Sequence, residues 1–340
     1  MMSEEKAAAL EYFGFRDLHP QVFMGTASDR YAGWIGQIYS GRRYADQVSR
    51  RSKKVGGSSF VEEVLPVESV EEYFQHFRVL ELDFTFYRPL IAEDGRPTQN
   101  FHVLRTYSQY LKGGDRLILK VPQSIFARKL RKGSSYVKNE QYLNPEIFTR
   151  DFYEPALGLL TPWLEGFIFE QEYQLKQDRP NPKGFAEELD AFFDAIPKDT
   201  RYHVELRTDA LLSAPVFTVF ERYGVGQVLS HWTWLPPLSR QFALSGQRFF
   251  NAGRNCIIRL MTPRGTRYED AYTRAHPFDK LVGGMLNPQM VDDTVVLMRT
   301  AIDRSIQVNV IINNRAGGNA PLIAQQVAKQ FLAGRSREEG

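Results

Sequence analysis

Two carboxylates stand two residues apart in the apolar stretch VLELDFTFYRP, residues 79–89. Glu81 and Asp83 alternate with leucine and phenylalanine, which is the spacing of a β-strand with both acids on one face. An unpaired charge buried in such a strand costs several kcal/mol, so both acids need cationic partners or a ligand. A carboxylate in a cleft can also act as a general acid or base. The stretch therefore holds candidate catalytic residues.

Charged residues recur at similar depths in three further apolar runs. They are Lys120 in RLILKVP, Glu205 and Arg207 in RYHVELR, and Arg259 in NCIIRLM. With the two acids of the first stretch they make three acids and three bases, enough for a reciprocal ion-pair network. The same groups fit a binding site in which the bases hold an anion and Glu205, Asp83 or Glu81 moves a proton.

The elements that position these residues follow from periodicity. Eight apolar runs of strand length are expected to be strands, at 21–26, 79–86, 116–122, 166–172, 201–207, 226–232, 255–261 and 306–314. Segments of helical spacing lie between them, at 67–77, 98–112, 148–164, 185–196, 292–305 and 320–334, with weak signals after strands five and six. This alternation predicts one α/β domain, a (β/α)8 TIM-like barrel over residues 1–335, and a disordered tail at 336–340. An open doubly wound sheet is the alternative.

Long loops are expected after strands one and three, and each contains a basic run. These are SGRRYADQVSRRSKK (40–54) and FARKLRKGSSYVK (126–138), and Arg315 follows the last strand. The loops after parallel strands meet at one rim of a barrel, so this rim is expected to be positive. The formal net charge is only +3, so the positive rim is inferred from the clustering of basic residues in these loops and not from the overall charge. It predicts a small phosphorylated or other anionic ligand or, alternatively, a nucleic acid that contacts the two loops.

The loop after the last strand, INNRAGGNAP, adds candidate ligand contacts. Asn313 and Asn314 stand at the strand end, and Gly318 precedes a capped helix. Glycine allows close approach to the backbone, and a helix N-terminus favours an anion by roughly 0.5–1 kcal/mol. Barrels frequently bind phosphate in this region. An ordinary glycine turn before a helix is the competing interpretation.

Other chemistries have little support in the sequence. The six histidines supply too few ligands at strand ends for a multi-zinc site, and only His231 is well placed there to titrate near neutral pH. No cofactor is expected, although one Mg²⁺ ion held by acids and waters is compatible with the residues. The chain has neither a G-x-x-x-x-G-K-[ST] phosphate loop nor a G-x-S-x-G nucleophile elbow. Whether the protein is an enzyme stays open.

The N-terminal segment and the single cysteine bear on location. MMSEEKAAALEYF has acids and no long apolar run, so neither a signal peptide nor a membrane anchor is expected there. Cys256 excludes an intrachain disulfide and lies beside two isoleucines, as a buried thiol would. A cytoplasmic protein without membrane contact is the expectation.

Taken in order, these pieces resemble the YecE-like family, barrel proteins described as a domain of unknown function. MGTASDRYAGWIGQIY is similar to its opening GTSGWSY-x-x-W-x-G-x-x-Y, which adds Thr26 to the candidate binding residues. The remaining matches are to E-x-N-x-T-F-Y-R at Glu81, K-x-P at Lys120, E-x-R-H at Glu205 and Arg207, R-x-H-G at Arg259, and N-N-x-x-x-G-x-A-P at Asn313, Asn314 and Gly318. The resemblance covers most of the chain and implies a barrel with a pocket, not a particular reaction.

The chain also departs from this family pattern. Ala27 and Asp29 replace a serine and a tryptophan, and Asp83 replaces an asparagine. Thr208 and Met261 stand where the pattern has histidines. A side chain able to act as acid or base is thus absent at two strand ends, which implies altered or lost chemistry.

Overall fold

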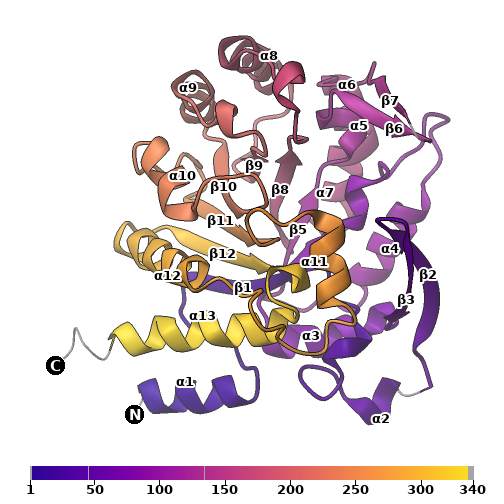
Figure 1. The fold of residues 1–340 in the computed structure, drawn as a ribbon. Coiled ribbons are helices and arrows are strands. Elements are labelled where there is room, and N and C mark those ends of the chain that lie inside the picture. Colours follow the sequence, from indigo (N-terminus) through magenta and orange to yellow (C-terminus); the bar gives the residue numbers. More distant parts are fainter. Residues whose placement is uncertain (1, 45, 134, 336–340) are drawn as a thin grey trace.

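Eight parallel strands close into a barrel in a computed structural model that describes residues 2–44, 46–133 and 135–335 (Figure 1). The strands are β1 (Val22–Ala27), β4 (Val79–Leu82), β5 (Arg116–Lys120), β8 (Leu164–Glu170), β9 (Tyr202–Glu205), β10 (Gly226–His231), β11 (Asn255–Leu260) and β12 (Gln307–Ile312). All eight predicted strands are present, and β1 pairs with both β12 and β4. The TIM-like barrel is confirmed, and the open sheet is wrong. The tail predicted at 336–340 lies outside the described residues.

Both faces of the barrel strands are buried, as expected of a parallel sheet covered by helices. In β11, Ile257 belongs to the cluster inside the barrel, while its neighbours Cys256 and Ile258 pack toward the surrounding helices. Ile311 of β12 shows the same alternation. Each nearly continuous apolar run therefore packs on one face inside the barrel and on the other face against the helices. A charged residue within such a run has no access to bulk water.

The helices surround the barrel (Figure 1). The longer ones are α1 (Met2–Glu11), α3 (Val70–His76), α4 (Gln99–Ser108), α7 (Glu154–Leu160), α8 (Pro182–Ala195), α9 (Ala214–Tyr223), α10 (Leu238–Leu244), α11 (Tyr268–Ala275), α12 (Pro288–Asp303) and α13 (Ala320–Arg335). Short helices are α2 (Gly41–Tyr44), α5 (Gln123–Phe126) and α6 (Pro145–Phe148). The helix predicted at 148–164 is divided, because a π-helical turn at Thr149–Tyr153 separates α6 from α7. The weakly signalled helices after strands five and six are present as α9 and α10.

The strand predicted at 79–86 is too long. β4 ends at Leu82, and Phe84–Phe86 form a 3-10 turn. The hydroxyl of Thr85 donates to the carbonyl oxygens of Leu82 (3.1 Å) and Lys120 (2.7 Å), which fixes this turn against the end of β5. Asp83 therefore follows the strand, and the prediction that it shares a strand with Glu81 is wrong.

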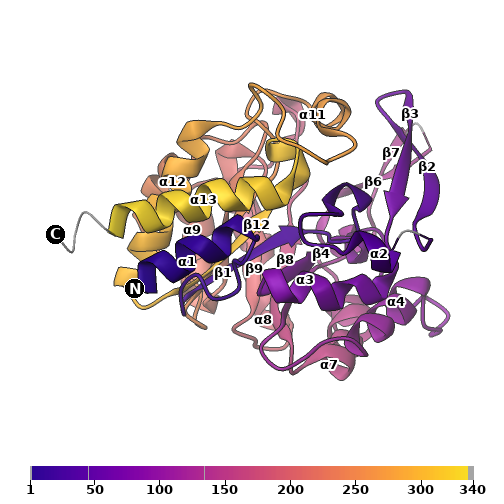
Figure 2. The same cartoon turned by 90° about the horizontal axis from the view of Figure 1, so that it is seen from below.

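The two long loops occur where they were predicted, but each contains an antiparallel hairpin that the sequence analysis missed. The first hairpin is β2 (Ser49–Val55) with β3 (Ser58–Val64), and the second is β6 (Lys129–Lys132) with β7 (Ser135–Lys138). Figure 2 shows β2 and β3 on the side of the molecule away from both termini. Most side chains of the first hairpin are exposed on both faces, so its strands lack the apolar alternation that reveals a strand in sequence.

A substitution at Gly25 tests the close contact between β1 and β4 that closes the barrel. It pairs with Val79 of β4, and a Cβ atom at this position would overlap the Val79 carbonyl oxygen. Gly25→Ala is expected to lower the free energy of unfolding by about 1–3 kcal/mol, because strand backbone must move to relieve the overlap. The measurement is urea unfolding followed by circular dichroism.

Gly158 in α7 provides the matched control, because a Cβ atom there meets nothing within 4 Å. Gly158→Ala is expected to stabilise the protein by about 0.5–1 kcal/mol through helix propensity. Equal effects of the two substitutions would contradict the packing argument.

Candidate functional site

A cavity of about 1100 Å³ opens where the barrel strands end and the hairpin β2–β3 stands over them. Glu81, Lys120, Glu170 and Arg259 line it from the strands, and Glu62 lines it from the hairpin. Barrel enzymes place their active sites at this carboxyl-terminal end. The cavity is therefore the candidate functional site.

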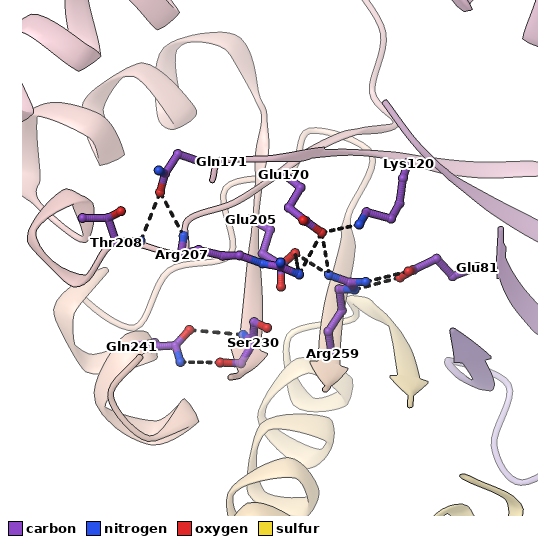
Figure 3. Close-up of polar contacts among 10 residues, drawn as sticks. All are labelled: Glu81, Lys120, Glu170, Gln171, Glu205, Arg207, Thr208, Ser230, Gln241 and Arg259. Carbon is purple, nitrogen blue, oxygen red and sulfur yellow. Dashed lines mark hydrogen bonds and ion pairs between the residues drawn. The ribbon is translucent and has the colours of Figure 1, made fainter. Parts of the chain in front are cut away.

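Arg259 forms the centre of an ion-pair network at the base of the cavity (Figure 3). Its side chain is 1% exposed, and its Nε and Nη2 atoms donate to the two carboxylate oxygens of Glu81 at 2.8 and 2.6 Å. Its Nη1 atom pairs with Glu205 and lies 3.5 Å from Oε2 of Glu170. One guanidinium thus holds carboxylates from three other strands, using the fork of donors that arginine supplies.

Glu170 forms the second centre of the network. Its Oε2 atom lies 2.8 Å from Nη2 of Arg207 and also pairs with Nζ of Lys120. The same Nη2 atom of Arg207 donates to Glu205 at 3.3 Å. Aromatic rings cover both cations: the Arg207 guanidinium lies 5.0 Å from the ring centroid of Trp232, and the Lys120 ammonium lies 4.0 Å from that of Phe86.

The strand register explains why the charges must pair. Glu170 of β8 stands directly beside Glu205 of β9, so two like charges share one point of the sheet. Arg207, just beyond β9, is kept close to them because the side-chain oxygen of Gln171 accepts the backbone N–H groups of Arg207 and Thr208 at 3.1 and 3.0 Å (Figure 3). The cations therefore offset a repulsion that the parallel register imposes.

Burial and ion pairing shift the pKa values of Glu81, Glu170 and Lys120 by different balances of opposing effects. Burial raises the pKa of Glu81, although Arg259 and Lys120 oppose that effect. Burial would also raise the pKa of Glu170, but Arg207, Lys120 and Arg259 together lower it to about 2. Burial lowers the pKa of Lys120, with Glu170 opposing. At neutral pH Glu170 is thus an anion that holds cations, not a proton donor.

Five of the six residues predicted to form a network do so, namely Glu81, Glu205, Lys120, Arg207 and Arg259. Asp83 lines the cavity but forms no ion pair within the described part of the chain. Glu170 takes its place in the network. Its signal was present in the sequence, because GFIFEQE has a glutamate at the same depth of an apolar strand as the others.

Thr26 and His231 lie outside the cavity lining. The Thr26 hydroxyl donates to the Ser28 carbonyl oxygen at 2.7 Å and bonds to the hydroxyl of Tyr73 at 3.0 Å, which indicates a role in packing. His231 is buried, and burial together with Arg264 lowers its pKa to about 4. The prediction that His231 titrates near neutral pH is wrong, because burial disfavours the imidazolium.

The last loop faces the cavity only in part. Asn313 lines it, and its side-chain oxygen accepts the backbone N–H of Arg315 at 3.0 Å. Asn314 accepts from Trp34 Nε1 at 3.1 Å and from the Ala320 N–H at 2.8 Å, so it ties the loop to its neighbours. Gly318, at φ 112°, packs against the backbone of residues 280–282 and is not part of the lining. Arg315, rather than the glycines, brings this loop to the cavity.

Local acids neutralise much of the predicted positive rim. Across the first hairpin, Glu62 pairs with Arg51 and Lys53 at 2.8 Å each, and Glu63 pairs with Arg50 at 2.9 Å. In the second loop, Lys129 pairs with Asp178, Lys138 with Glu140, and Arg128 with Glu188. Counting the basic runs alone overestimated the charge, because the acids that pair with them lie on β3 for the first hairpin and elsewhere in the chain for the second.

Metal ligands do not cluster at the site. Within residues 2–44, 46–133 and 135–335, no group of three or more His, Cys, Asp or Glu side chains could hold a metal ion. No helix in these ranges has the length and apolar character to cross a membrane.

Arg259 is expected to be essential for folding stability. Arg259→Ala leaves Glu81 and Glu205 buried without their main partner and should lower the free energy of unfolding by about 3–5 kcal/mol. Arg222→Ala is the control, because Arg222 forms an exposed ion pair with Asp190 and its loss should change stability little. Both values come from urea unfolding at neutral pH. A loss below about 1 kcal/mol for Arg259→Ala would show that the network is not structural.

Glu170 is expected to link stability to pH. Its pKa is lowered from 4.5 to about 2, so its stabilising contribution is present above pH 4.5 and is lost as the pH falls towards 2. The shift corresponds to about 3 kcal/mol. Urea unfolding between pH 6 and pH 3 should therefore show the gap between wild type and Glu170→Gln shrinking as pH falls. The exposed Glu221 supplies the control, since Glu221→Gln removes only an exposed ion pair with Arg248 and should change stability little; a constant large gap for Glu170→Gln would contradict the shift.

Comparison with known proteins places the chain in a family. No curated protein matches it. A DUF72 family protein of Enterococcus faecalis V583 is similar in structure, with a TM-score of 0.55 and 16% identity over 91% of this chain and 95% of that one. One of Thermotoga maritima MSB8 has a TM-score of 0.58 and 13% identity over 92% and 99%. At these identities the likeness concerns the fold alone. The sequence matches the family described as "Protein of unknown function DUF72" over residues 23–338. The resemblance to the YecE-like family, which is DUF72, is thereby confirmed, and the chain belongs to the DUF72 family.

Proposed function

We propose that this DUF72 barrel binds a small anionic molecule, such as a phosphorylated one, in the cavity at the carboxyl-terminal end of the barrel. Acid–base chemistry on the bound molecule is the reaction class that the side chains of the cavity suit best. The proposed binding requires no metal or organic cofactor.

Arg315 is the observation that carries this proposal. It lines the cavity from the loop after β12, and no ion pair engages it within the described part of the chain. Its guanidinium lies 4.4 Å from the ring centroid of Tyr268, and its buried Nε atom has no hydrogen-bond partner in the ranges 2–44, 46–133 and 135–335. A cation that lines a cavity without an anionic partner favours an anionic ligand.

Arg207 supplies a second unused donor. Its Nη2 atom pairs with Glu170, but its Nε atom is buried and none of the described residues accepts a hydrogen bond from it. Lys120 and Arg259, by contrast, are engaged by Glu170, Glu81 and Glu205. The cationic groups available to a ligand are therefore fewer than the sequence suggested, which favours a small anion over a long polyanion.

Among the acids predicted to move a proton, Asp83 has the most freedom to do so. Glu81 and Glu205 are committed to ion pairs with Arg259 at the base of the cavity. Asp83 lines the cavity outside the network. It is thus the candidate acid or base among the three.

The proposal is tested by a thermal-shift screen at about 50 and 300 mM salt against orthophosphate, sugar phosphates, mononucleotides and short single-stranded and duplex oligonucleotides. A small anion bound in the cavity should raise the melting temperature at both salt concentrations. Binding to many phosphates of a nucleic acid should instead weaken steeply with salt. An oligonucleotide as the only hit, lost at high salt, would overturn the proposal in favour of nucleic-acid binding.

Arg315→Gln sharpens the same experiment. Loss of a charge-assisted hydrogen bond is expected to weaken binding of the small-anion hit about 10- to 100-fold in calorimetry. Arg267→Gln is the matched control, because it removes the same charge from an exposed residue that is not part of the cavity lining. Equal losses in the two variants would mean that general charge, and not the cavity, holds the anion.

A further inference from the structure

Asp29, in the loop directly after β1, lines the same cavity and is almost completely buried, at 1% exposure. Its Oδ1 atom accepts a hydrogen bond from the Tyr107 hydroxyl at 2.9 Å, and its backbone oxygen accepts one from the Tyr39 hydroxyl at 2.7 Å. Its Oδ2 atom is buried and has no hydrogen-bond partner among the residues that the structure describes. The carboxyl group is thus held firmly on one side and left with one unused oxygen, which in a folded protein needs an explanation.

No ion pair neutralises this carboxyl group within the part of the chain that the structure describes. The charged and titratable groups that influence it are Arg30, Tyr39, Tyr73, Asp83 and Tyr107. Arg30 is the cation among them, and its Nε atom donates to the Leu65 carbonyl oxygen. Burial raises the pKa of Asp29 to about 6, and Asp83 adds to the effect, while Arg30 and the Tyr107 hydrogen bond oppose it. Both protonation states are therefore accessible near neutral pH.

We propose that Asp29 exchanges a proton with the molecule bound in the cavity and that Tyr107 is its positioning residue. In the ionised form, Oδ2 accepts a proton from an O–H or N–H group of the ligand. The ligand heteroatom keeps the bonding electron pair, and the carboxyl group becomes neutral. The reverse step returns the proton. The ligand class is then an anion that also has a hydroxyl or amine group, and this inference rests on the proposed function.

The departures from the family pattern agree with this role. Asp29 stands where the pattern has a tryptophan, while Thr208 and Met261 stand where it has histidines. The chain therefore has a titratable side chain at the cavity where the pattern has none, and lacks two where the pattern has them. Proton transfer by Asp29 would be a property of this chain rather than of the family pattern.

The first test follows the carboxyl groups by carbon-13 NMR of protein labelled at aspartate. One aspartate resonance of the wild type is expected to titrate near pH 6 and to be absent in Asp29→Asn. Tyr107→Phe should move this titration to higher pH, because a hydrogen bond to the ionised form is lost. Asp83→Asn should move it to lower pH, because a neighbouring negative charge is removed. Absence of an aspartate titration near pH 6 would overturn the inference.

The second test uses sulfate as the probe, because its charge does not change between about pH 5 and pH 8. Ionisation of Asp29 beside the bound anion should weaken sulfate binding about three- to tenfold across this range in the wild type. The affinity of Asp29→Asn should be independent of pH. The same pH dependence in both proteins would overturn the inference while leaving anion binding intact.

The two tests separate the inference from the function on which it rests. Failure of sulfate to bind at any pH, together with a titration near pH 6, counts against the proposed function alone. Should Asp29→Asn fail to fold by circular dichroism, the opposite shifts in Tyr107→Phe and Asp83→Asn identify the Asp29 titration. Absence of both shifts overturns the assignment.

Discussion

The requirement that buried Arg259 be paired governs the carboxyl-terminal end of this barrel. Its guanidinium reaches from β11 to carboxylates on β4, β8 and β9 and so joins strands that are not neighbours. Isolated charges at this depth would be prohibitively costly, and each is tolerable only while the others hold their positions. Glu170 extends the same constraint to Lys120 and Arg207. The network is therefore rigid, because moving one member would leave the others buried without an ion-pair partner.

A network of three acids and three bases that satisfy one another has little left to offer a ligand. Apart from the Nε atom of Arg207, the groups with unused capacity lie in the loops above it: Asp29 after β1, Asp83 after β4 and Arg315 after β12. The strand residues and the loop residues therefore have different roles. The strand residues fix the shape and the electrostatic potential at the base of the cavity, while the loop residues contact a bound ligand. It is the division expected of a barrel, in which a rigid scaffold positions loops that vary.

The sequence could predict whatever depends on local periodicity. Apolar runs and their spacing predicted all eight strands, and the charged residues within those runs predicted most of the network. The same reasoning applied to the fourth strand would also have predicted Glu170. Contacts between distant residues were out of reach. The end of β4 depends on Thr85 bonding to Lys120 across 35 residues, and the neutral rim depends on Glu62 facing Arg51 across a hairpin. The low pKa of His231 reflects burial, which no local pattern reveals.

The family pattern and the departures from it occupy different places in the cavity. The motif positions Glu81, Lys120, Glu205, Arg207 and Arg259 all belong to the network, so motifs that are scattered along the chain meet there. Four of the five departures, at Ala27, Asp29, Asp83 and Met261, line the cavity above that network, while Thr208 is buried next to Arg207. What this chain has in common with the pattern is therefore the rigid base, and what differs is the surface that a ligand would meet. Such a separation lets binding and proton transfer change while the buried charges, and the fold that depends on them, stay as they are.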